Sequence, residues 1–83
     1  MKSYFDLERE RQIKHGTDAI RKAMDFDISK ETAFILLESI FNYMYSNTSV
    51  MGVKEIAAKK LGFIIDDSCA IDIYNAYKAD KYL

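Results

Sequence analysis

The sequence predicts an all-α protein that folds as one compact bundle of four to five short helices. Its 83 residues suffice for a single domain, 1–83, near the lower size limit for a self-sufficient core. Proline is absent and glycine occurs only three times, whereas small β-proteins need turns rich in both residues. Apolar residues make up 49% of the chain, and they recur at helical spacing in most of its segments.

The first predicted helix covers residues 3 to about 14 and is strongly charged. Ser3 is a suitable N-cap, with Asp6 three residues later as in a capping box. Few side chains here are apolar, so residues 1–15 form either a charged, semi-independent N-terminal helix or the start of a longer one. Glycine in a helix interior costs about 1 kcal/mol relative to alanine. We therefore expect a break or kink near Gly16, with a second helix from Thr17 to Asp25.

The strongest helical pattern runs from Lys30 to about Ser46, after the N-cap Ser29. Its apolar positions recur three and four residues apart, which is the spacing of one helix face. The predicted buried face is Ala33, Leu37, Ile40, Phe41 and Met44. We also expect the core to take up the aromatic rings of Phe26, Phe34, Tyr74 and Tyr77.

Two more helices are predicted in the C-terminal half of the chain. The first runs from Val50 to Leu61 and is followed by Gly62, where a C-terminal glycine is expected. The second runs from about Asp66 to Lys81, and residues 66–68 supply its N-terminal cap, with acids in the first turn. The predicted inward residues of the pair are Val53, Ile56, Ala57, Leu61, Ala70, Ile73, Tyr74 and Tyr77.

A faint internal repeat relates residues 20–40 to residues 57–77 without gaps. The identical pairs are Lys22 and Lys59, Phe26 and Phe63, Ile28 and Ile65, and Ala33 and Ala70. The repeat suggests two related helical hairpins. Ordinary amphipathic hairpins also reach this level of similarity, so both interpretations stay open.

Charge and composition exclude several classes of protein. Twelve basic against thirteen acidic side chains give a net charge of −1, which is not the charge of a basic nucleic-acid-binding domain. The longest apolar run, residues 33–37, is far too short to span a bilayer.

The single cysteine, Cys69, suits a reducing cytoplasm, and we expect no secretory signal at the N-terminus. Ile, Lys, Tyr, Phe, Met and Asn far outnumber Gly, Ala, Arg and Pro, which suggests an AT-rich gene of a bacterium, phage or plasmid.

No residue pattern predicts a catalytic, cofactor or metal site. His15 and Cys69 are each the only residue of their kind and lie far apart in the sequence, unlike the ligands of a structural zinc site. Asp25, Asp27 and Ser29 have the spacing that starts a calcium loop, but Lys30 and Leu36 stand where that loop needs glycine and an acid. Asp66, Asp67 and Asp72 lack a matched general acid, and two of them are ordinary helix-start acids. We expect a protein that is not an enzyme and has no cofactor.

Residues 53–61 and 66–81 resemble the two helices of a helix-turn-helix motif, with Gly62 in the turn. The DNA-binding residues of this alternative are Lys59, Lys60, Asn75 and Lys78. The second helix of such a motif presents its N-terminal residues to the bases, yet Asp66 and Asp67 begin this one. Those carboxylates disfavour DNA binding, unless another surface such as Lys14, Arg21 and Lys22 carries it.

Six tyrosines and five phenylalanines are many for so short a chain, and tyrosine is favoured at protein interfaces. Six residues fall off the predicted core faces and form the predicted partner-binding set: Ile35, Tyr43, Ile71, Asn75, Lys78 and Tyr82. The predicted function is that of a cytoplasmic regulator or inhibitor that binds a protein, such as an immunity or anti-defence protein of a bacterium or mobile element. A homodimer would use the same surface.

Overall fold

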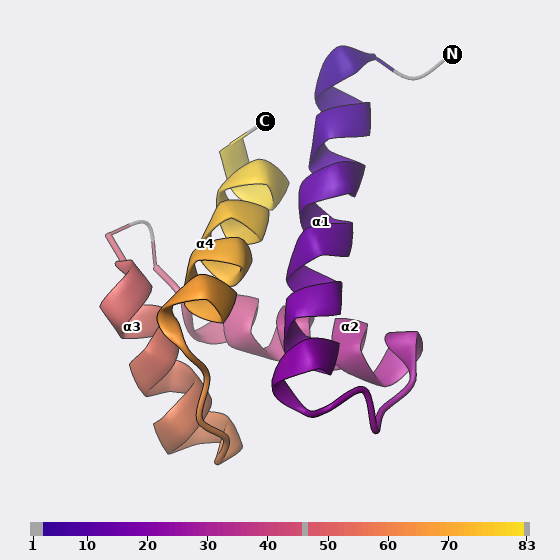
Figure 1. Cartoon of the computed structure of the whole chain (residues 1–83). Coiled ribbons are helices and arrows are strands. Elements are labelled where there is room, and N and C mark those ends of the chain that lie inside the picture. The colour runs from indigo at the N-terminus through magenta and orange to yellow at the C-terminus, as the bar shows by residue number, and fades with distance from the viewer. Residues whose placement is uncertain (1–2, 46, 83) are drawn as a thin grey trace.

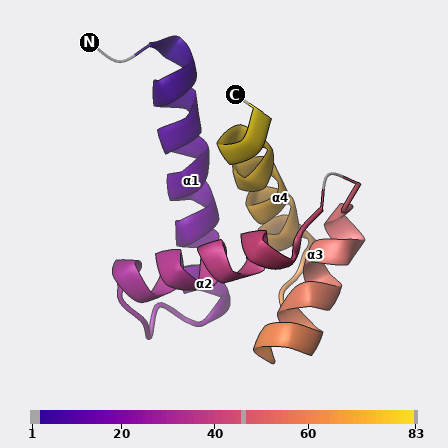
Figure 2. The same ribbon diagram turned by 180° about the vertical axis from the view of Figure 1, so that it is seen from behind.

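The computed structural model describes residues 3–45 and 47–82, apart from the side chain of Tyr82. It contains α1 (Tyr4–Ala23), α2 (Lys30–Tyr43), α3 (Val50–Ile56), the π-helical turn η1 (Ala57–Leu61) and α4 (Asp67–Tyr82). Helix α4 lies between α1 and α3, and α2 crosses behind them (Figure 1). From the opposite side α2 lies in front (Figure 2). The prediction of an all-α bundle is confirmed, with four helices.

The predicted caps form where the sequence placed them. Ser3 and Asp6 make a reciprocal capping box at the start of α1. The Ser29 hydroxyl accepts the Thr32 backbone N–H at the start of α2, and the Asp66 carboxylate accepts that of Cys69 at 2.8 Å. These bonds satisfy backbone donors that have no partner within the helix.

The expected break near Gly16 is wrong, because α1 runs without interruption from Tyr4 to Ala23. Gly16 is buried, and a Cβ atom built on it would lie 2.9 Å from Cβ of Ala76 and 3.2 Å from Cδ1 of Leu37. The glycine therefore lets α1, α2 and α4 approach closely, and packing outweighs its low helix propensity. Residues 4–15 are accordingly part of one long helix and not a separate element.

The core lies between the four helices, and the predicted face of α2 is confirmed in full. Its residues Ala33, Leu37, Ile40, Phe41 and Met44 are all buried. The rings of Phe41 and Tyr77 meet edge to face with centroids 5.5 Å apart. Burial of Phe26 and Phe34 was predicted wrongly, since both rings are exposed. Phe26 lies in the connection before α2, at positive φ, and Phe34 lines a hollow where α1, α2 and α4 meet. Helix α2 also ends earlier than expected, with Met44 as its C-cap, and Ser46 lies outside the described residues.

The predicted helix 50–61 changes character at Ala57, where the α-helix gives way to η1. In a continued α-helix Lys60 would lie about two turns beyond the buried Val53, on the same inward face. The wider π-helical turn shifts this register, so Lys60 is exposed and Leu61 is half-buried. Gly62 ends the element with φ 76°, as predicted for a C-terminal glycine. Short π-helical segments are rare and are often found at functional sites.

The connection between α1 and α2, residues 24–29, is here named the Phe26 turn. Asp25 and Phe26 have φ values of 57° and 60°, a conformation that residues other than glycine rarely adopt. The Arg21 guanidinium lies over the Phe26 ring at 5.5 Å, and its Nε donates to the Ile28 carbonyl at 3.1 Å. Arg21 thus holds the strained turn in one shape.

Replacing Asp25 by glycine is expected to raise the free energy of unfolding by roughly 0.5–1 kcal/mol, because glycine adopts positive φ without a Cβ clash. Denaturant unfolding of the variant measures the gain. Asp27→Gly is the matched control, since Asp27 has no positive φ, and it should give no gain. Equal effects of the two changes would show that the Asp25 backbone is not strained.

Candidate interaction surfaces

The chemically reactive side chains do not converge in the structure. Within residues 3–45 and 47–82 no three His, Cys, Asp or Glu side chains are close enough to share a metal ion. Cys69 is buried, and its thiol donates to the Ala19 carbonyl at 3.4 Å. Burial, with the nearby Asp66 and Asp72 carboxylates, raises the pKa of this thiol from 9.0 to about 12. His15 is exposed in the middle of α1, and not at a helix end as a break at Gly16 would have placed it.

Cys69 is therefore expected to react slowly with a disulfide reagent at pH 8, because the thiolate is the reactive form and the folded thiol stays protonated. The same measurement in denaturant should give fast labelling. Since the unfolded thiol loses its proton first as the pH rises above about 9, this group should lower the stability of the fold at alkaline pH. Fast labelling of the native protein would contradict the burial of Cys69.

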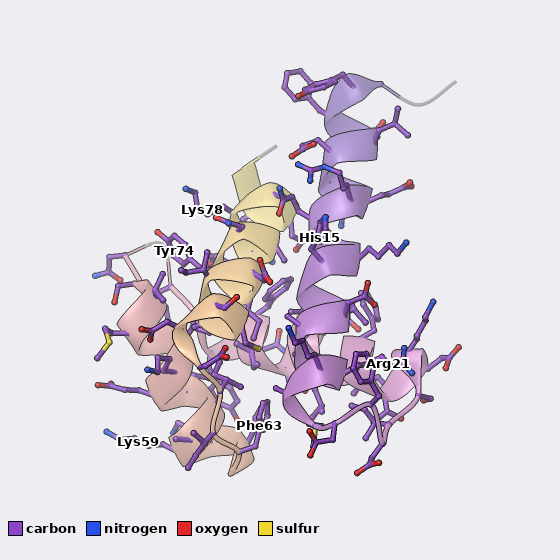
Figure 3. The ribbon with its side chains drawn as sticks, viewed as in Figure 1. His15, Arg21, Lys59, Phe63, Tyr74 and Lys78 are labelled. Atoms are coloured by element: carbon purple, nitrogen blue, oxygen red, sulfur yellow. The ribbon has the colours of Figure 1, made fainter. Side chains whose placement is uncertain are left out.

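Three of the six predicted partner-binding residues lie along the outer face of α4. Ile71 is 46% exposed, Asn75 is half-buried and Lys78 is exposed. The Lys78 ammonium lies over the Tyr74 ring at 5.3 Å (Figure 3). The Tyr82 side chain lies outside the described residues. One apolar side chain, Ile71, remains on this described stripe.

Ile35 does not join that stripe. It is 60% exposed on the side of α2 opposite the buried Leu37 and Ile40, between Glu31 and Glu38. Helix α2 forms the back of the molecule and α4 faces the front (Figures 1 and 2). The predicted partner-binding residues therefore lie on more than one surface.

Tyr43 lies instead in a hollow at the other end of α2, here named the α2–α3 groove. This groove has a volume of about 410 Å³ and is formed by the C-terminal end of α2, the residues before α3, and α3 with η1. Its larger side chains are Tyr43, Tyr45, Glu55, Ile56, Lys59 and Lys60. The structure thus brings one residue predicted for protein binding together with two predicted for DNA binding.

Exposed aromatic rings and positive charge coincide in the α2–α3 groove. Tyr43 is 44% and Tyr45 72% exposed, and the Lys60 ammonium lies over the Tyr43 ring at 5.5 Å. Among the described residues no carboxylate pairs with Lys59 or Lys60, although Glu55 lies at the edge. The groove therefore has a net positive charge above an apolar and aromatic floor.

Sequence reasoning missed Tyr45 and Ile56 as members of this surface. Tyr45 follows the last turn of α2, where no periodicity assigns a side chain to a face. Ile56 shows the spacing of a core residue but is only half-buried. The sequence gives one sign of this surface, the adjacent pair Lys59 and Lys60. A continued α-helix would partly bury these positions, which is unfavourable for charged side chains.

The residues of the DNA-binding alternative are not on one surface. Lys59 lies at the lower end of the molecule and Lys78 near the C-terminal end of α4 (Figure 3). Asp67, at the start of α4, forms an ion pair with Lys54 at 2.8 Å. Helix α4 packs against both α1 and α3.

A second hollow, of about 300 Å³, lies where α1, α2 and α4 meet. Its floor is Ile13, Phe34 and Phe41, and both acidic and basic side chains surround it. Arg9 and Asp80 form an ion pair at its edge. Its mixed charges do not favour one class of ligand.

None of the described helices is long and apolar enough to cross a membrane. No protein family, curated protein or solved structure matches this chain.

Proposed function

We propose that this protein acts without catalysis, as a small regulator or inhibitor that binds another protein through its α2–α3 groove. The observation that carries the proposal is that one hollow combines exposed tyrosines with two lysines that have no carboxylate partner among the described residues. Tyrosine gives a large contact area with a polar tip and is frequent among residues that dominate binding energy.

The charges of the groove favour an acidic partner. Lys59 and Lys60 are exposed and have no carboxylate partner among the described residues, so each is available to a carboxylate of another molecule. Charge complementarity of this kind speeds association and excludes wrong partners. The preferred partner segment therefore presents carboxylates beside an apolar or aromatic side chain.

A protein partner is favoured over nucleic acid by the charge of the surrounding surface. Affinity for nucleic acid grows with the number of phosphates that basic side chains neutralise, and the groove offers two lysines beside Glu55. The net charge of the whole chain is −1. A phosphate backbone would therefore meet few cations beyond the groove itself.

The test is capture of a binding partner from a lysate of the encoding organism, with the tagged protein and two charge-reversed variants. Lys59→Glu with Lys60→Glu should abolish capture of the partner. Lys14→Glu with Lys81→Glu, which changes net charge equally at exposed positions on α1 and α4, should leave capture unchanged. Equal capture by all three proteins would contradict a role of the groove.

The helix-turn-helix alternative makes a separate prediction about double-stranded DNA. We expect no binding that weakens steeply with salt at physiological ionic strength, whereas a DNA-binding protein releases counterions and shows such dependence. Electrophoretic mobility shifts at two salt concentrations measure it. Sequence-selective binding that Lys59→Ala or Asn75→Ala weakens would replace the proposal by the alternative.

A further inference from the structure

We infer that the α2–α3 groove of one copy receives the Phe26 turn of a second copy, so that the protein self-associates head to tail. This inference rests on the proposed function in one respect, namely that the groove binds protein. It assigns the groove an occupant that the chain itself supplies.

The Phe26 turn has the chemistry that the groove favours. The Phe26 ring is 59% exposed and stands between Asp25 and Asp27, both exposed and without an ion pair among the described residues. The turn thus offers an aromatic ring flanked in the sequence by two carboxylates, with the Arg21 guanidinium over the ring and the exposed Lys22 and Lys30 just outside the turn. The groove offers two tyrosines, the side chain of Ile56, and two lysines against one carboxylate, that of Glu55. Aromatic contact and charge are complementary between these two sites.

The turn is also held in a fixed shape before any contact is made. Arg21 covers one side of the Phe26 ring and bonds to the Ile28 carbonyl. A side chain that is already ordered loses less freedom on binding. The chain places an aromatic residue at positive φ, where glycine would be less strained, and strained positions of this kind concentrate at functional sites.

The two sites lie too far apart for a contact within one molecule. The Phe26 turn precedes the N-terminal end of α2, whereas the groove begins at its C-terminal end. Arg21 and Lys59, which mark the two sites, lie at opposite sides of the molecule in Figure 3. A contact between different surfaces of two copies is a head-to-tail contact. The resulting linear oligomer has an unoccupied Phe26 turn at one end and an unoccupied α2–α3 groove at the other.

Sedimentation velocity of the purified protein from about 10 μM to about 1 mM tests this, a range suited to a small and weak interface. The mean mass of the unaltered protein should rise with concentration. The groove variant, Lys59→Glu with Lys60→Glu, should associate at least about tenfold more weakly, because like charges then face each other. The turn variant, Asp25→Lys with Asp27→Lys, should show the same loss.

Mixing the two variants gives the decisive result for a head-to-tail contact. In the mixture, the acidic turn of the groove variant can bind the basic groove of the turn variant, which is the native contact. The glutamates in the groove variant can also bind the lysines in the turn of the other variant, which is the same contact with its charges exchanged. Association should therefore return in the mixture. A single chain with all four substitutions should also regain it. The control, Lys14→Glu with Lys81→Glu, should associate like the unaltered protein, and circular dichroism checks that every variant is folded.

An unaltered protein that stays monomeric throughout overturns the inference, as does a mixture that stays monomeric. The inference is also overturned if the groove variant associates as strongly as the control. None of these outcomes contradicts the proposed function if, in the capture experiment, the unaltered protein binds a different protein and the groove variant does not. Self-association through the groove with no other protein captured would instead contradict the proposed function alone.

Discussion

Leu37→Ala is expected to lower the free energy of unfolding by about 2–5 kcal/mol, the usual range for a buried leucine. Leu37 is fully buried at the centre of the bundle, and its methyl groups lie against the position of Gly16 on α1. Because helices α1, α2 and α4 all meet here, their side chains cannot easily close the cavity that the substitution leaves. Denaturant unfolding followed by circular dichroism measures the loss.

Ile35→Ala is the matched control for Leu37→Ala. It lies two residues away on the same helix but on the exposed side, where substitutions usually change stability by less than about 0.5 kcal/mol. A large loss for Ile35→Ala together with a small loss for Leu37→Ala would show that α2 packs with the other face inward.

Gly16→Leu is expected to destabilise the bundle by about 3 kcal/mol or more, at the upper end of overpacking effects. Even a Cβ atom at this position would meet Ala76 Cβ at 2.9 Å, and that atom moves only with the backbone of α4. A leucine would therefore force α1 away from both α4 and α2. Thermal unfolding of the variant measures the effect.

The contact between Gly16 and Ala76 can be isolated by a double-mutant cycle. Alanine at Gly16 gains about 1 kcal/mol of helix propensity, so a net loss of stability shows that the clash outweighs it. Ala76→Gly removes the opposing Cβ, and the double variant should be more stable than the two single changes predict by addition. Strict additivity would mean that α1 and α4 do not meet at these positions.

The helices and their caps could be predicted because both follow from local sequence. Ser3, Ser29 and Asp66 cap as expected, and the inward face of α2 follows from its spacing alone. The continuity of α1 could not be predicted. Whether Gly16 breaks a helix or lets one pack closely depends on Ala76 and Leu37, which lie far away in the sequence.

The candidate surface was predictable only in fragments. Sequence spacing places Tyr43 among the protein-binding residues, and Lys59 and Lys60 in the DNA-binding alternative, because it treats each helix separately. Their meeting depends on how α2 turns into α3 and on the π-helical register of η1. Neither feature has a signature in the local sequence. The exposure of Phe26 was missed for a similar reason, since an apolar residue in a turn is expected to pack inward unless the backbone prevents it.

Site-specific photo-crosslinking tests the central claim, binding of protein through the α2–α3 groove, most directly. A photoreactive phenylalanine analogue would replace Tyr45, in the groove, and in separate proteins Ile71 on α4 and Ile35 on α2. The account predicts adducts with a partner protein from position 45 that disappear when Lys59 and Lys60 are changed to glutamate, and none from positions 35 and 71. Adducts from position 35 or 71 with none from position 45 would contradict it.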